Sequence, residues 1–172
     1  MQTIQNFIKN YPITMTVKQI DNRPDNYSGD GFHWVVTLSH DNHTMTVYYT
    51  MGYAHCTFKP KFFSIQSKKK ADELQQTGYM YRWEKVKDIC ESYGIVITPK
   101  PPTMKDILYC LGLDCRSVEW ERDFEGWCKS LGYDPDSRKA DHIYNATLQE
   151  RKDLMQLLGL KGYEALLEVE EE

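Results

Sequence analysis

The sequence lacks the features that would place it in a membrane or in an oxidising compartment. Its 172 residues contain no run of about 18 apolar residues, the minimum for a transmembrane helix. The first eleven residues have neither the basic start nor the apolar stretch of a signal peptide. The five cysteines are odd in number and irregularly spaced, which is typical of a reducing compartment. We therefore expect a soluble cytoplasmic protein with no membrane partner.

Motifs of catalysis and cofactor binding are missing as well. The sequence has no nucleophile elbow, no P-loop and no dinucleotide fingerprint. Asp134 and Asp136 are spaced like the first ligands of a calcium loop, but the central glycine and the terminal glutamate of that loop are absent. We predict that the protein is not an enzyme and needs no cofactor, and the sequence identifies no small-molecule substrate.

A zinc signature is also absent, because no C-x-x-C pair occurs. A metal site could still be assembled in space from scattered residues, although an unpaired cysteine is more often a small buried hydrophobe. We favour no metal site, and a metal-dependent enzyme stays as a second alternative. The weak candidate ligands are His55, Cys110, Cys115 and Cys128.

What the sequence does contain is the composition of a globular protein with an uneven charge. Hydrophobic residues make up 41% and charged residues 27% of the chain, and aromatics reach 13%. Residues 59–100 carry 9 basic and 5 acidic groups, whereas residues 101–172 carry 9 basic and 16 acidic groups. Such an asymmetry bears on the partners of a protein more than on its fold.

The N-terminal part predicts a helix and a small sheet. Ile4, Phe7 and Ile8 share one face of a helix. Apolar and polar residues then alternate over 13–17, 32–38 and 44–50, which predicts three half-buried strands. The turn-rich run 23–31 separates the first two strands, and 39–42 joins the last two. We expect a three-stranded antiparallel meander covered by helices.

The C-terminal part predicts a series of helices. Thr103 and Asp106 resemble a capping box, and Gly112 is expected to end that helix. A second helix spans about 120–131 and ends at Gly132. The third is expected to begin at Asp134-Pro135 and to run to about residue 158, followed by a break at Gly159 and a last turn over 163–168.

The middle segment, residues 57–100, is basic and aromatic. Its periodicity predicts a helix over 80–93 that ends at Gly94, and a short strand over 95–97, whereas residues 59–70 look like a solvated basic loop. Lysines neutralise phosphates and aromatic rings stack on bases, so a nucleic-acid partner is one reading. An acidic protein surface is the other. The candidate partner-binding residues are Lys59, Lys61, Phe62, Phe63, Lys68, Lys69, Lys70, Tyr79, Tyr81, Arg82 and Trp83.

Taken together, these patterns predict a single α+β domain in three parts. Residues 1–56 form the N-terminal helix and sheet, residues 57–100 an inserted basic and aromatic segment, and residues 101–172 three to four packed helices. Deleting residues 58–100 is therefore expected to leave a folded core.

Two stretches resemble a family of small uncharacterised proteins of phages, prophages and plasmids. The first is TMTVYYTMGYAH at 44–55, and the second comprises PPTMKDILYCLGLDCRSVE at 101–119 and DFEGWCKSLGYDPDSRKADHIYNA at 123–146. In that family the histidine and the P-P-T run lie close together, whereas residues 57–100 separate them here. Asp134, Asp136, Ser137 and Arg138 match the family motif as a helix start with polar contacts.

The resemblance implies a protein of a mobile element that works in the cytoplasm of a bacterial host. It supplies no catalytic residues. Small proteins in that context often disarm host defences by binding, as anti-CRISPR proteins do. We therefore expect a stoichiometric inhibitor of a host defence protein, most concretely a CRISPR RNA-guided nuclease. The alternative is a phage nucleic-acid-binding accessory protein.

Overall fold

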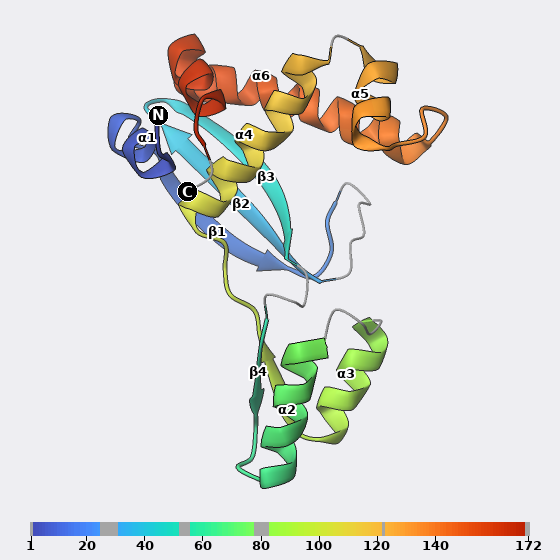
Figure 1. Cartoon of the computed structure of the whole chain (residues 1–172). Helices are drawn as coiled ribbons and strands as arrows, with labels where there is room; N and C mark the ends of the chain where they lie inside the picture. The colour runs from blue at the N-terminus through green and yellow to red at the C-terminus, as the bar shows by residue number, and fades with distance from the viewer. Residues whose placement is uncertain (1, 25–30, 52–55, 78–82, 122, 171–172) are drawn as a thin grey trace. The chain divides into compact units, whose positions relative to one another are not determined.

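The computed structural model describes residues 2–24, 31–51, 56–77, 83–121 and 123–170, and it confirms the α+β class (Figure 1). One helix, four strands, two helices and a fifth strand make up the first part of the chain, and the elements described after β5 are helices. The elements in chain order are α1 (Ile4–Asn10), β1 (Thr14–Ile20), β2 (Phe32–His40), β3 (His43–Met51), β4 (Thr57–Pro60), α2 (Ile65–Thr77), α3 (Trp83–Ser92), β5 (Ile95–Thr98), α4 (Met104–Trp120), α5 (Phe124–Leu131) and α6 (Arg138–Leu167).

The predicted three-stranded antiparallel meander is present, with the strand order β1-β2-β3. Burial alternates along β2, where Trp34, Val36 and Leu38 are buried and the residues between them are half-buried. The turn between β2 and β3 places Asp41 at a φ of 51°, a left-handed conformation that aspartate adopts more readily than most residues. The alternation read from the sequence therefore reports the true pleat of these strands.

The chain divides into two compact units. Unit 1 comprises residues 1–16, 37–47 and 103–172, and unit 2 comprises residues 17–36 and 48–102. The two units share the three long strands, each of which runs from one unit into the other. Each unit has its own buried residues.

Unit 1 is built on α4 and α6, which pack against each other, with α1 against both and α5 against α6. Phe7, Leu108 and Leu154 are fully buried. A short parallel bridge joins Gln2 to Val169. The predicted C-terminal helices therefore pack against one another and against α1.

The helix ends in unit 1 confirm several of the predicted signals. Thr103 and Asp106 form a reciprocal capping box at the start of α4, and Gly132 ends α5 at a φ of 74°. Gly159 interrupts α6 with a φ of 70° and a ψ of 169°, so that α6 consists of two helical stretches across a kink.

Two other helix boundaries were predicted wrongly. Gly112 does not end α4, which continues to Trp120, and Gly112 is one of the buried residues of that helix. Asp134 is not the N-cap of α6, because Ser137 caps it and accepts from the Ala140 amide. Asp134 instead accepts from the Asp136 amide and forms a turn before the helix.

Unit 2 contains a second sheet that the sequence reading missed. The strands β4 and β5 pair antiparallel with Phe58 opposite Ile97, and α2 packs on β4 while α3 packs on β5. The expected short strand over 95–97 is β5, and the expected helix before Gly94 is α3. The core of this unit comprises Met51, Cys56, Phe58, Ala71, Leu74, Val86, Cys90 and Ile95.

The reading of residues 59–70 as a basic loop is wrong, because β4 and α2 occupy most of this range. Only Ser67, Ala71 and Leu74 of α2 are buried. They lie at positions i, i+4 and i+7 of the helix, which is a narrow stripe. Because two of these three positions are a serine and an alanine, the hydrophobicity of the sequence does not show the helical period of this stripe.

Candidate functional site

Among the described residues of unit 2, the most exposed large apolar side chains lie at the connection between β4 and α2, which we call the aromatic turn (residues 61–65). Phe62 is 68% exposed, Phe63 97% and Ile65 86%. An isolated exposed apolar residue is ordinary, but a contiguous group is typical of an interaction site. The turn contains two of the residues predicted to bind a partner.

Backbone hydrogen bonds hold the turn against the loop that precedes β5. The Lys61 amide donates to the Gly94 carbonyl over 2.6 Å. The Ser67 amide donates to Ser64 Oγ over 2.9 Å, which caps α2, and Ser67 Oγ donates to the Tyr93 carbonyl over 3.2 Å. These bonds fix the backbone on both sides of Phe63, so its ring is presented to solvent from an anchored position.

Gly94 brings the two loops together. It has a φ of +63°, and a side chain there would lie 3.1 Å from Cδ2 of Phe62. Glycine is therefore favoured at this position both by the left-handed backbone and by the approach of the Phe62 ring. The Phe62 ring lies over this glycine, whereas Phe63 is almost fully exposed.

Lysines surround the aromatic turn. Lys59, Lys61, Lys68 and Lys69 are exposed. The Lys61 amine lies 5.9 Å from the centroid of the Phe62 ring, within range of a cation–π contact. The turn therefore combines positive charge with apolar area, as the sequence predicted for this segment.

Lys70 differs from these four lysines because it is engaged within the unit. Its amine lies 3.1 Å from a carboxylate oxygen of Glu73 and 6.0 Å from the centroid of the Tyr93 ring. It is half-buried, so we assign it a structural role in unit 2. Of the remaining predicted partner residues, Tyr79, Tyr81 and Arg82 lie outside the described residues, and Trp83 is the first residue of α3.

The weak metal candidates do not form a cluster in the described part of the chain. There, no group of three or more His, Cys, Asp and Glu side chains could hold a metal ion, and His55 lies outside the described residues. Cys128 is buried in the cluster around Trp127. Burial, with a smaller contribution from nearby carboxylates, raises the pKa of Cys115 to about 12. A nucleophilic cysteine needs the opposite shift.

A polar cluster between α4 and α6 was not foreseen from the sequence. Glu119 accepts from Arg151 Nε and, over 2.7 Å, from the Tyr163 hydroxyl. The hydrogen bond from Arg151 is the main cause that lowers the pKa of Glu119, and burial raises the pKa of Tyr163. The cluster joins the two main helices of unit 1, so a structural role accounts for it. Glu119 and Arg151 are 32 positions apart, and no local pattern connects them.

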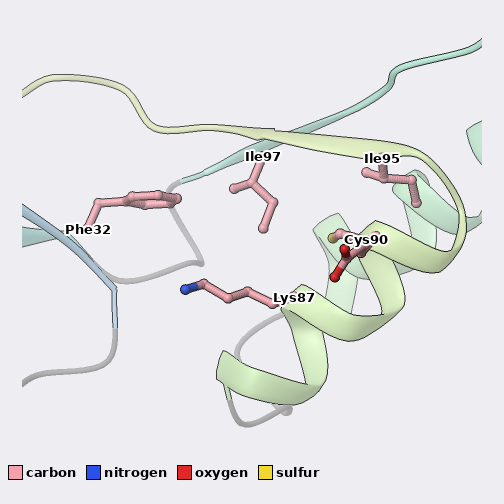
Figure 2. Close-up of a pocket in the computed structure, with 6 residues that line it drawn as sticks. Phe32, Lys87, Cys90, Ile95 and Ile97 are labelled. Carbon is pink, nitrogen blue, oxygen red and sulfur yellow. The ribbon is translucent and has the colours of Figure 1, made fainter. Parts of the chain in front are cut away.

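Unit 2 also has a pocket of about 340 Å³, lined by Phe32, Lys87, Cys90, Glu91, Ile95 and Ile97. Figure 2 shows the Lys87 side chain extending from α3 toward Phe32, with Cys90 on the same helix and Ile95 on β5. Burial raises the pKa of Cys90, which keeps the thiol protonated. The lining offers apolar walls, the cation of Lys87 and the carboxylate of Glu91, but no activated nucleophile, so the aromatic turn is the stronger candidate site.

Comparisons with protein-family models, with curated proteins and with solved structures found no match to this chain. The family resemblance described above stays a prediction. Among the described residues, none of the helices has the length and apolar character needed to cross a membrane.

Proposed function

We propose that this protein acts by binding, and that it docks the aromatic turn on an acidic surface of a partner protein. The observation that carries the proposal is the 97% exposure of Phe63 on a backbone that hydrogen bonds to Gly94 and Tyr93 anchor. Because the backbone at Phe63 is already ordered, binding has to restrict little more than the two side-chain torsions of its ring. Such residues are the usual centres of binding hot spots.

The lysines around the turn indicate the chemistry of the partner surface. Lys59, Lys61, Lys68 and Lys69 are exposed, and they would meet carboxylates at the rim of an interface. Rim charges of this kind speed up association and select the partner, while the apolar centre supplies most of the affinity. The proposed interface therefore has Phe63 at its centre and lysines at its edge.

The family resemblance gives the proposal its biological setting. In a phage or prophage, a small binding protein of this kind would block a host defence, and we take the partner to be a CRISPR RNA-guided nuclease. Such an enzyme must hold a guide, admit target DNA and move a nuclease domain before it cuts. A protein that occupies any of these places inhibits it in a one-to-one ratio without chemistry.

Nucleic-acid binding is the second candidate, because the same lysines and rings could neutralise phosphates and stack on unpaired bases. The two candidates differ in their response to salt. Binding through phosphate contacts falls steeply as the salt concentration rises, whereas an interface centred on Phe63 retains most of its affinity.

The test is a cleavage assay with a panel of purified RNA-guided nucleases and increasing amounts of this protein. We expect full inhibition of at least one nuclease near a one-to-one molar ratio, at moderate and at high salt. Phe63→Ala should weaken inhibition by roughly 30-fold, which corresponds to a hot spot of about 2 kcal/mol. Leu160→Ala is the matched control, since Leu160 is also an exposed apolar residue, at 60%, but lies in unit 1.

Three outcomes would contradict the proposal. Inhibition well below a one-to-one ratio would indicate turnover and favour the metal-dependent enzyme. Inhibition or binding that requires nucleic acid and disappears at high salt would favour the accessory protein. Equal effects of Phe63→Ala and Leu160→Ala would show that the aromatic turn is not the interface.

A further inference from the structure

The small sheet of unit 2 has two outer edges, one along β4 and one along β5, since no third strand pairs with it in the described part of the chain. Opposite residues of an antiparallel pair alternate between those that bond to each other and those whose amides and carbonyls point outward. The Lys61 amide donates to the Gly94 carbonyl, and this pair follows Pro60 and Ile95 in the register. Counting back from it along the ladder, Ile95 and Ile97 direct their backbone groups outward from β5.

The amide of Phe58 confirms this assignment and shows how the β4 edge is protected. Phe58 lies opposite Ile97, and its amide donates over 3.4 Å to the side-chain oxygen of Gln75 on α2. An amide that reaches a helix side chain points away from β5, as the alternation requires. Pro60, the other outward residue of β4, has no amide hydrogen. Both outward positions of β4 therefore lack a free amide donor, which discourages pairing with a further strand.

The β5 edge has neither of these protections. Among the described residues, no group outside the ladder hydrogen bonds to the backbone of Ile95 or Ile97. These two residues present amide donors and carbonyl acceptors at the repeat of a strand. Another strand supplies partners at the same repeat, so an unpaired edge of this kind is a template for strand addition.

The pocket described above lies beside this edge. Within the described part of unit 2, its lining comes from α3, β5 and Phe32 rather than from α2 or β4. Figure 2 shows the Ile97 side chain pointing from β5 toward α3, with Phe32 at one end and Ile95 and Cys90 toward the other. In an added antiparallel strand, the residues opposite Ile95 and Ile97 direct their side chains to this same face. The pocket of about 340 Å³ gives such side chains an apolar place to pack.

The backbone of β5, and not the charge of the pocket, determines which occupant fits. The pocket has one cation and one anion, Lys87 and Glu91, so its charges favour neither an acidic nor a basic ligand. The outward amides and carbonyls of β5 need partners at alternate positions of an extended chain, which a helix cannot offer because its own backbone groups are bonded internally.

A second copy of this chain fits the edge less well than a single strand. Packed helices lie about 8–10 Å apart, whereas neighbouring strands are about 4.8 Å apart. Since α2 packs on β4 and α3 on β5, around one core, α3 must extend beyond β5 over the position of the next strand. In an antiparallel two-fold pairing through β5, the α3 helices of the two copies would occupy the same space. A strand that brings no helix of its own avoids this conflict.

We propose that the β5 edge binds an extended segment of a partner protein, which joins the sheet as an antiparallel strand and packs alternate apolar side chains into the pocket beside α3. The segment is recognised by its backbone and by aliphatic residues at every second position, facing Phe32 and Ile97. This surface is separate from Phe63, and the inference does not rest on the function proposed for the aromatic turn.

The test uses the full chain and three short peptides of alternating threonine and valine with blocked ends. One peptide is unmodified, one is N-methylated at its valines and one at its threonines. In the proposed arrangement the valines lie opposite Ile95 and Ile97, so their amides donate to β5, while the threonine amides point away. NMR titration should show saturable shifts of the Ile95 and Ile97 amides with the unmodified and the threonine-methylated peptide. The valine-methylated peptide should bind at least tenfold more weakly.

A pair of variants at one position tests the same bond from the protein side. Ile97→Pro removes the outward amide without touching the bonds to β4, a placement of proline that edge strands tolerate. It should weaken binding of the unmodified peptide at least tenfold, as followed at the Ile95 amide. Ile97→Ala is the matched control: it keeps the amide and shortens the side chain, so it should weaken binding less than Ile97→Pro does. Circular dichroism checks that both variants are folded.

Four outcomes would overturn the proposal. They are the absence of shifts at β5 with any peptide at millimolar concentration, equal binding of the two methylated peptides, loss of binding on methylation of the threonines alone, and undiminished binding by folded Ile97→Pro. If Ile97→Pro does not fold, the two methylated peptides still decide the question. Sedimentation of the protein alone adds a fifth: dimers that Ile97→Ala weakens would assign the edge to a second copy instead. No nuclease is present in these experiments, so their result is independent of the role proposed for the aromatic turn.

Discussion

Replacing Gly94 by alanine tests how the aromatic turn is held. An L-residue in the left-handed region costs about 1–2 kcal/mol, and the stiffer unfolded chain of an alanine variant offsets about 0.4–1 kcal/mol of this. The new Cβ would lie 3.1 Å from the Phe62 ring, but that ring is 68% exposed and can move outward. We therefore expect Gly94→Ala to lower the free energy of unfolding by about 1 kcal/mol, equivalent to roughly 2–4 °C in Tm for a chain of this size.

Gly132→Ala is the matched control. Gly132 has a φ of +74° and nothing within 4 Å of the position of a side chain, so it experiences the same backbone cost without the ring contact. The two variants should differ by less than about 0.5 kcal/mol in urea unfolding. Only Gly94→Ala should speed hydrogen exchange at the Lys61 amide, whose acceptor is the Gly94 carbonyl.

The reasoning about Gly94 would be refuted by a variant as stable as the natural protein, because the positive φ would then carry no cost. It would also be refuted if Lys61 exchange were unchanged in Gly94→Ala, since the turn would then not depend on this loop. A weakened inhibition of the nuclease in Gly94→Ala, with Gly132→Ala normal, would connect the conformation of the turn to its proposed role.

Three further predictions concern the cores. Glu119→Gln should lower the free energy of unfolding by about 1 kcal/mol at pH 7, because the carboxylate is about one-third exposed and its ion pair is partly screened. Since the pKa of Glu119 is lowered in the folded protein, the ion pair stabilises the fold above about pH 4.3. This stabilisation is lost as the pH falls through the pKa of the folded protein. Urea unfolding at several pH values measures it, and a Glu119→Gln difference that does not change with pH would contradict the ion pair. Cys115, whose pKa is about 12, should resist iodoacetamide at pH 8 in the folded protein and react after unfolding, as mass spectrometry can follow; rapid reaction in the folded state would contradict its burial. Replacing residues 58–100 by a short linker should leave the helical signal of unit 1 in circular dichroism. Met51 loses its cover in this variant, which should lower the free energy of unfolding by about 1.5–3 kcal/mol. A fully unfolded chain would show that both units require the deleted segment.

The sequence predicted best the elements with strong local signals. The three long strands follow from strict alternation, and the capping box at Thr103 and the break at Gly159 follow from side-chain chemistry within four residues. The start of α6 was misplaced because the run from Asp134 to Ser137 offers two good caps. Which of them begins the helix depends on the turn that Asp134 makes with Asp136, and composition does not reveal that turn.

The site was predicted only in part, for physical reasons. The sequence shows the basic and aromatic character of residues 59–70. It does not predict that Phe63 is exposed, because a pair of phenylalanines is more often buried. The turn that carries Phe63 is held by the bond between the Lys61 amide and the Gly94 carbonyl, 33 positions apart, which no local pattern predicts. A local boundary was also misplaced: Trp120 was assigned to the helix of Trp127, whereas it ends α4 and is exposed.

The division of the chain into units has a consequence for its synthesis on the ribosome. All of unit 2 has been translated once residue 102 is added, whereas unit 1 still lacks residues 103–172. At about 5–20 residues per second these residues take about 4–14 s to make. During that interval Ile4 and Phe7, which are buried in the finished protein, have no helix α4 or α6 to cover them. Nascent chains stalled near residue 102 are therefore the form of this protein that should depend most on a ribosome-associated chaperone.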